Sequence, residues 1–132
     1  MPTTHSDQGI VRIKCAQDVP QTMARLEQLF LAHGLTIFAR IDFSGDAARS
    51  GLIMRPEQML IFGNPKGGTP LMQQAPTVGL DLPLKALVWE DDQGATWVAC
   101  NTADYIVQRH GLPSEMSKNL AGAVALLQQV SA

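Results

Sequence analysis

Two runs of apolar residues, separated by only four positions, constrain the fold most. Pro83–Glu90 and Ala95–Cys100 are rich in aliphatic, aromatic and β-branched side chains, and Asp91–Gly94 joins them. Such runs predict β-strands, and Gly94 stands where a hairpin loop commonly needs positive φ. A link of this length joins only antiparallel neighbours. The segment therefore predicts a β-hairpin, and with it a sheet that is mainly antiparallel.

Three further segments predict strands of the same sheet. Gly9–Cys15 and Leu35–Phe43 place apolar residues at alternate positions, which is typical of a strand with one buried face. Pro56–Phe62 differs, because its last four residues are all apolar. That pattern is typical of a central strand that is covered on both faces.

Two main helices are predicted at residues 18–33 and 114–130. In the first, Asp18 suits the N-cap, Pro20 is tolerated in the first turn, and Gly34 stands at the usual C′ position. The second carries one apolar stripe at heptad-like spacing. The first helix joins two predicted strands, which form either a parallel crossover or an antiparallel return. Shorter helical segments are expected at 70–75, 76–80 and 103–110.

The expected fold class is α+β. We predict a five-stranded, mainly antiparallel sheet with the two main helices on one face and short helices around it. The 132 residues, of which 45% are hydrophobic, suffice for one domain with a sizeable core. We expect residues 9–132 to form this domain and residues 1–8 to be a flexible N-terminus.

The charge pattern argues against several classes of partner. The formal net charge is −2, with both signs interspersed, so nothing favours a nucleic-acid partner. The apolar runs fall well short of the ~18 residues that a spanning helix needs, so no membrane partner is expected. The first residues lack the basic and apolar regions of a signal peptide. The expected location is therefore cytoplasmic.

Cys15 and Cys100 are the only cysteines. In a reducing compartment they are expected to be small buried thiols, although a disulfide between them remains the alternative. Their spacing relative to the three histidines is not that of a zinc site, so no metal is expected. The sequence indicates no particular cofactor.

The stretch after the third predicted strand is the candidate site. Asn64, Lys66, Gly67, Gly68 and Thr69 form a glycine-rich turn that is expected to open a short helix, with Thr69 as its N-cap. Glycine permits positive φ and close approach, and amides at a helix N-terminus attract anions. The residue order is not that of a P-loop. The turn predicts a pocket for a small molecule or an anionic metabolite or, alternatively, only a tight strand-to-helix connection.

Several charged residues are secondary candidates. Arg40 and Asp42 share one face of a predicted strand, where they either hold a ligand or form an ordinary surface ion pair. Asp81 either caps the turn into the fourth strand or acts as a general base, and Lys85 either has a structural role or reaches the pocket mouth.

Four segments together resemble one known family. They are FARIDFSGDA at 38–47, LIFGNPKGGTPLM at 60–72, GLDLPLKALVWED at 79–91 and TWV at 96–98. In this order and spacing they resemble the domain-of-unknown-function 302 (DUF302) family over roughly residues 11–112. The resemblance implies a compact α+β domain, often paired with itself, and no assigned catalytic residues. Similar members commonly carry a histidine where this chain has Phe43, so histidine chemistry is not expected there.

Two functional hypotheses follow. The favoured one is a homodimeric module that binds a small molecule or anion at residues 63–70. The second is a small enzyme with Asp42 or Asp81 as general base and the turn amides as oxyanion donors. Binding is favoured because no nucleophile–base pair is visible in the sequence. Dimerisation is expected because two helices cannot cover the whole sheet, including Trp89 and Trp97. A purely structural role is the third possibility.

Overall fold

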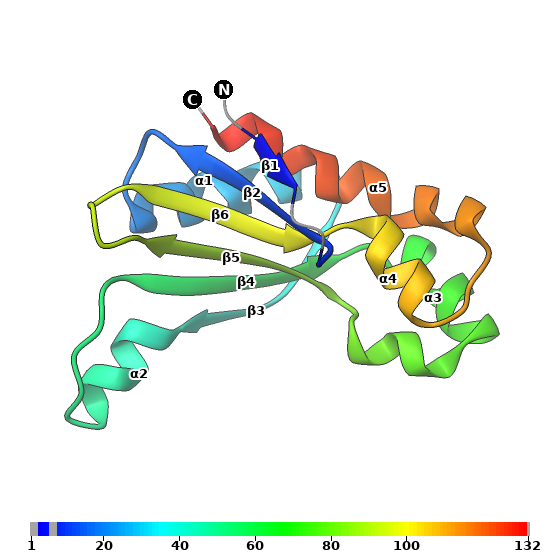
Figure 1. Cartoon of the computed structure of the whole chain (residues 1–132), viewed down its shortest axis with the longest axis horizontal. Helices are drawn as coiled ribbons and strands as arrows, with labels where there is room; N and C mark the ends of the chain where they lie inside the picture. Colours follow the sequence, from blue (N-terminus) through cyan, green and yellow to red (C-terminus); the bar gives the residue numbers. More distant parts are fainter. Residues whose placement is uncertain (1–2, 6–7, 132) are drawn as a thin grey trace.

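The computed structural model describes residues 3–5 and 8–131, and within them it forms one six-stranded antiparallel sheet (Figure 1). The strand order is β1-β2-β6-β5-β4-β3. The α+β class, the five predicted strands and the hairpin are confirmed. The strands are β1 Thr3–His5, β2 Ile10–Cys15, β3 Thr36–Asp42, β4 Glu57–Gly63, β5 Leu84–Glu90 and β6 Thr96–Asn101.

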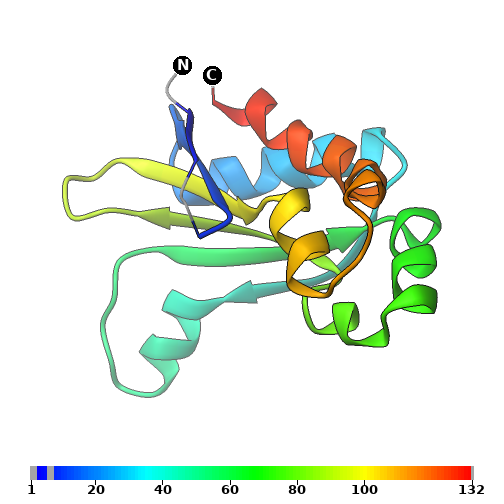
Figure 2. The same ribbon diagram turned by 45° about the vertical axis from the view of Figure 1, so that its right-hand side comes forward.

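Helices α1 and α5 lie over one face of the sheet, α3 and α4 gather at one of its ends, and α2 lies at the other end (Figures 1 and 2). Helix α1 passes behind the strands, and the C-terminal helical segment packs beside it. The helices are α1 Val19–Ala32, α2 Phe43–Arg49, α3 Pro65–Gln74, α4 Ala103–Arg109 and α5 Lys118–Ala125. The 3-10 turns are η1 Pro76–Leu80, η2 Ser114–Ser117 and η3 Leu126–Val130, so the predicted helix 114–130 combines η2, α5 and η3.

Helix α1 begins and ends where its sequence predicts. The Asp18 side chain accepts a hydrogen bond from the Gln21 amide at 2.9 Å. At the other end Gly34 adopts φ 75°, which lets the chain leave the helix in the left-handed conformation. Met23, Leu26 and Phe30 turn one stripe of the helix into the core, where the Phe30 ring stacks on Phe62 of β4.

The order of the strands resolves the connection through α1. Strand β2 pairs with β6 and β3 pairs with β4, so three strands separate β2 from β3. Since every neighbouring pair is antiparallel, β2 and β3 point in the same direction. The crossover is thus parallel in direction, but its strands are not neighbours.

Strand β4 differs from its prediction, because it lies next to the edge strand β3 and is buried on one face only. Leu60 and Phe62 are fully buried under the helices, whereas Met59 and Ile61 on the other face are partly exposed. The continuous apolar run therefore indicates an open hydrophobic sheet face and not a doubly covered strand.

Two other segments depart from expectation. Strand β1 falls within residues 1–8, where no regular element was expected, and pairs with β2. Phe43, assigned to a strand from its sequence, instead begins α2, because the Asp42 carboxylate accepts a hydrogen bond from the Gly45 amide and caps a new helix. A register shift between Ile37 and Ala39 also breaks the predicted alternation of β3.

Candidate functional site

The glycine-rich stretch is helical from its start, which corrects the predicted helix at 70–75. Asn64 is the N-cap of α3, and its Oδ1 accepts a hydrogen bond from the Lys66 amide at 3.0 Å. Pro65 takes the first helical position, which suits a residue without an N–H group. Thr69, expected to be the N-cap, lies inside the helix together with Pro70.

The amides that were expected to face a ligand are already hydrogen-bonded. Those of Gly67 and Gly68 donate to the Asn64 carbonyl at 2.9 and 3.0 Å. Neither glycine has positive φ. The prediction that these amides bind an anion is therefore wrong, because their hydrogens are already bonded within the turn.

The requirement for glycine at 67 comes from close approach. A Cβ at this position would lie 2.5 Å from the backbone oxygen of Asn119 on α5. The Asn119 side chain also donates to the Gly67 carbonyl at 3.2 Å. These contacts fasten the start of α3 to α5.

A hollow remains beside this junction. Its volume is about 270 Å³, and it lies between the ends of β4 and β5, helix α3 and helix α5. Its walls are mainly apolar, and the polar residues at its border are Asn64, Thr69 and Asn119. The apolar side chains that line it are Phe38, Pro65, Met72, Leu82, Pro83, Leu84, Leu120 and Ala123. The arrangement can hold a small apolar molecule with few polar groups.

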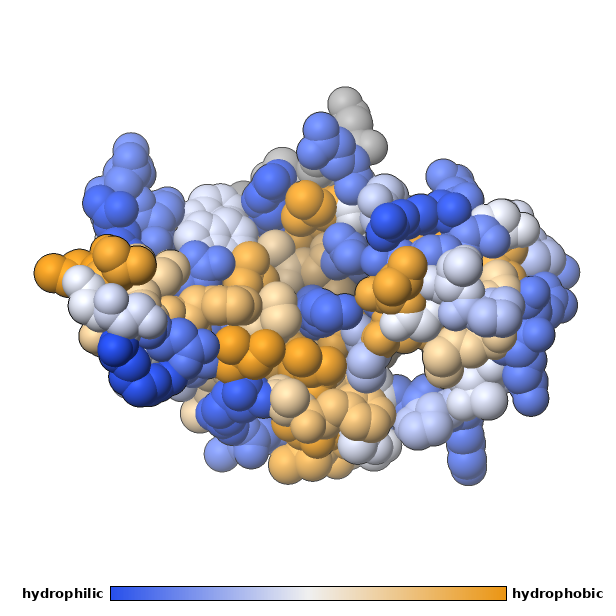
Figure 3. All heavy atoms as spheres, turned by 90° about the horizontal axis from the view of Figure 1, so that it is seen from below, coloured by the Kyte–Doolittle hydropathy of each residue, from blue (hydrophilic) through white to orange (hydrophobic). Residues whose placement is uncertain are grey.

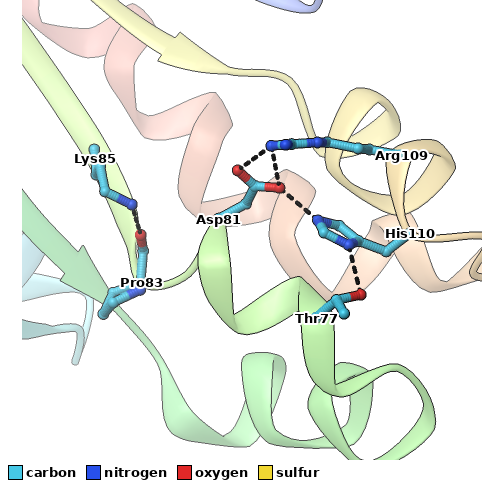
Figure 4. Close-up of polar contacts among 6 residues, drawn as sticks. All are labelled: Thr77, Asp81, Pro83, Lys85, Arg109 and His110. Carbon is cyan, nitrogen blue, oxygen red and sulfur yellow. Dashed lines mark hydrogen bonds and ion pairs between the residues drawn. The ribbon is translucent and has the colours of Figure 1, made fainter.

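One side of the hollow is formed by the segment before β5. The Leu82–Pro83 bond is cis, and both residues face the hollow. The Lys85 ammonium donates to the Pro83 carbonyl at 3.2 Å (Figure 4). Lys85 does not line the hollow, and its hydrogen bond to the Pro83 backbone is the structural role that the sequence left open.

Arg40 and Asp42 lie apart from this site. Gly63 pairs with Thr36 at one end of β3, whereas Asp42 pairs with Gln58 at the other. Arg40 forms an ion pair with Glu27 of α1, so the predicted pair with Asp42 is wrong.

The Asp42 carboxylate forms its hydrogen bonds with nearby residues of the chain. Besides capping α2, its carboxylate accepts a hydrogen bond from the Ser44 hydroxyl at 2.8 Å. The hydrogen bond from the Gly45 amide, followed by that from Ser44, lowers the pKa of Asp42. Its environment is therefore that of a cap and not of a base beside the turn.

Asp81 follows η1 and belongs to a second polar cluster, none of whose members lines the hollow (Figure 4). Its carboxylate accepts from Arg109 Nη1 at 2.9 and 3.1 Å and lies 2.5 Å from His110 Nε2. His110 Nδ1 lies 2.9 Å from the Thr77 hydroxyl oxygen. Thr77, His110 and Asp81 thus form one continuous hydrogen-bonded chain.

Sequence reasoning missed this cluster. Thr77 and His110 are 33 positions apart, and no local motif links them. His110 stands at the C-terminal end of α4, where a histidine needs no special role, yet its side chain is only 5% exposed and engaged at both nitrogens. Only the packing of η1 against the end of α4 brings these residues together.

The fold and hollow define a small α+β domain with one open sheet face and an apolar pocket between α3, α5 and the strand ends. The family model for the domain of unknown function DUF302 matches residues 11–127. The chain belongs to this family. Within the described residues, no helix has the length and apolarity needed to cross a membrane.

The crystal structure of an uncharacterized conserved DUF302 protein from Bacillus stearothermophilus has a similar fold. The TM-score is 0.83 at 18% identity, over 94% of this chain and 98% of that chain. At this identity the likeness concerns the fold alone.

Curated relatives with sequence similarity carry a different description. Fluoride-specific ion channel FluC 1 of Brucella suis biovar 1 (strain 1330) is 40% identical over 106 residues, which are 80% of this chain and 42% of that protein. FluC 1 of Brucella abortus biovar 1 (strain 9-941) is 40% identical over 106 residues, 39% of its length. The chain therefore spans about two-fifths of the curated relatives it matches.

Proposed function

We propose that this protein is a binding module for a small, largely apolar molecule, held in the hollow beside the start of α3. The observation that carries the proposal is the hollow itself, with its apolar lining next to residues 63–70. Ligand sites are typically concave and mainly apolar, with a few polar groups that fix orientation. Asn64, Thr69 and Asn119 are the polar residues at this border.

The volume of the hollow and the state of the nearby backbone amides favour a particular class of ligand. A volume of about 270 Å³ lies just below the roughly 300–1,000 Å³ of sites for drug-sized ligands. A single aromatic ring or a short acyl chain fits that size. An anion is disfavoured, because Gly67 and Gly68 have committed their amides to Asn64.

The test is a thermal-shift titration with indole and, separately, with inorganic phosphate. Ligand that binds only the native state stabilises it by about 2.7 kcal/mol at 100 times Kd, so indole should raise the midpoint. Ala123→Leu fills the hollow and should abolish the shift. Ala121→Leu changes an exposed alanine of the same helix and should leave the shift intact.

Two results contradict the proposal. The first is an equal indole shift in wild type and Ala123→Leu. The second is a phosphate shift that disappears in Lys66→Ala, which would favour an anion site at the turn.

We further propose that the module works as a homodimer through its open sheet face. Register places Met59, Leu87 and Ala99 in one row, and Trp89 beside Trp97 in the next. Apolar rows of this kind are typical of surfaces that bind another protein. We also retain the cytoplasmic location, which the free, buried thiols of Cys15 and Cys100 support.

A second candidate function rests on the curated relatives. Because 106 residues at 40% identity lie within proteins described as fluoride channels, the domain is a candidate companion of such a channel. The test is co-expression of this chain with the Brucella suis protein from which the matched part has been deleted. Restored fluoride resistance supports the companion role, and unchanged sensitivity contradicts it.

A further inference from the structure

We propose that Thr77, His110 and Asp81 form a nucleophilic centre that hydrolyses small acyl esters. The centre lies outside the hollow and goes beyond the proposed binding function. Nucleophilic catalysis needs a hydroxyl within hydrogen-bond reach of a base, and a third group that orients the base. Thr77 is the hydroxyl, His110 the base and Asp81 the orienting group.

The distances fit these roles. Thr77 Oγ1 and His110 Nδ1 are 2.9 Å apart, within the roughly 2.6–3.2 Å expected for a nucleophile and its base. His110 Nε2 and Asp81 Oδ2 are 2.5 Å apart. In neutral His110, the Nε2–H donates to Asp81 and Nδ1 accepts from Thr77, so both ring nitrogens have the required polarity.

The three side chains of the centre differ in solvent exposure in the way that the reaction requires. Thr77 is exposed, whereas the side chains of His110 and Asp81 are only 5% and 11% exposed. The nucleophile thus meets solvent while its base is shielded. Arg109 contacts both oxygens of Asp81 and keeps that carboxylate in place.

The proposed reaction transfers an acyl group through Thr77. Its Oγ bonds to the ester carbonyl carbon as the carbonyl π pair moves onto the carbonyl oxygen. The Thr77 proton passes to His110 Nδ1, and Asp81 stabilises the imidazolium through Nε2–H. That pair then re-forms the carbonyl as the carbon–oxygen bond to the leaving alcohol breaks, and the departing oxygen takes the proton from Nδ1. Water repeats both steps on the Thr77 ester, releasing the acid and restoring the hydroxyl.

The surroundings of Thr77 favour a small apolar acyl group. Side chains three positions apart in a 3-10 helix lie on the same side. Leu80 stands three positions after Thr77 in η1 and is 75% exposed. An acyl chain bound at Thr77 therefore meets an apolar side chain.

The test combines p-nitrophenyl acetate turnover with peptide mass spectrometry of the acylated protein. We expect a single acetyl adduct on Thr77, retained in Thr77→Ser and absent in Thr77→Val. His110→Gln should lower the acylation rate by about 10²–10⁴-fold, the usual contribution of a general base. Asp81→Asn should lower kcat with little change in KM, as expected for a positioning residue.

The controls separate acylation at this centre from the reactivity of other surface groups and from loss of folding. His33→Gln removes an exposed imidazole, and Thr36→Val removes an exposed hydroxyl elsewhere; both should leave turnover unchanged. Adducts on His33 or lysines, or equal turnover in wild type and Thr77→Val, would overturn the proposal. Thr77→Val is nearly isosteric and should fold. Its unfolding midpoint checks that a loss of turnover does not come from a loss of folding.

Discussion

At the scale of single residues, the same glycine signal has two different physical causes in this chain. Gly34 and Gly94 adopt positive φ where a helix ends and where a hairpin turns. Gly67 does not, and is required because Asn119 on another helix passes too close for a Cβ. A sequence marks both kinds of position equally, and only the packing partner distinguishes them.

The first prediction concerns Gly67. Gly67→Ala should lower the free energy of unfolding by about 1–3 kcal/mol, because the new methyl group overlaps a backbone oxygen that cannot turn away. Gly122→Ala is the matched control: it lies in α5 with nothing within 4 Å of the added Cβ. It should stabilise by about 0.5–1 kcal/mol. Urea unfolding measures both, and two changes of equal sign contradict the close contact.

The second prediction concerns the buried thiols. Burial raises the pKa of Cys15 to about 11 and that of Cys100 to about 12, from 9.0. The unfolded state therefore loses its thiol protons first as pH rises. The contribution of the two protonated thiols to the free energy of unfolding is complete below about pH 9. It is lost as pH rises through the folded-state pKa values.

Unfolding experiments between about pH 8 and pH 11 check this sign. Wild type should lose stability with a steeper slope than Cys100→Ala, the difference approaching about 1.4 kcal/mol per pH unit above pH 9. Parallel slopes in the two proteins would contradict a protonated native Cys100.

At the scale of elements, local capping decides where the short helices begin. Asn64 starts α3 five residues before Thr69, and Asp42 starts α2 at the end of β3. In both cases a side-chain oxygen accepts an amide hydrogen of the first turn.

The third prediction tests the cap of α3. Asn64→Ala should cost about 1 kcal/mol of stability, because the Lys66 amide loses its acceptor. Asn64→Asp keeps the oxygen and adds a charge that is favourable at a helix N-terminus, so it should remain close to wild type. Equal losses in the two variants would show that the Asn64 amide nitrogen, and not Oδ1, matters.

How far the sequence predicts each element depends on how local its causes are. The hairpin at 91–94 and helix α1 follow from nearby turn and capping residues, and both are confirmed. The position of β4 beside an edge depends on strand order, which no local pattern encodes. The cluster of Thr77, Asp81 and His110 depends on packing between η1 and α4, and the pocket on α3 meeting α5.

At the scale of the whole molecule, the helices leave one sheet face without a comparable cover. Figure 3, which shows the side where β3 lies, has hydrophobic residues gathered between α2 and the region of α3 and η1. Beyond α2 the chain projects Leu52 and Ile53, which are 66% and 100% exposed. A second copy is the occupant we propose for this face, because it presents the same apolar surface in return.

The last prediction therefore concerns assembly. Leu87 stands between Met59 and Ala99 on the open face, so Leu87→Glu would place a charge inside the proposed interface. Sedimentation velocity should find wild type as a dimer and Leu87→Glu as a folded monomer, because the variant buries an unpaired charge in the interface. Leu31→Glu changes a leucine of α1 that is 56% exposed, on the opposite face, and should remain dimeric.

A monomeric wild type would contradict the proposed dimer. A monomeric Leu31→Glu together with a dimeric Leu87→Glu would place the interface on the helices instead. The Leu87→Glu monomer should keep the wild-type indole shift, because Leu87 does not line the hollow. Losing that shift together with the dimer would mean instead that the partner copy helps to form the binding site.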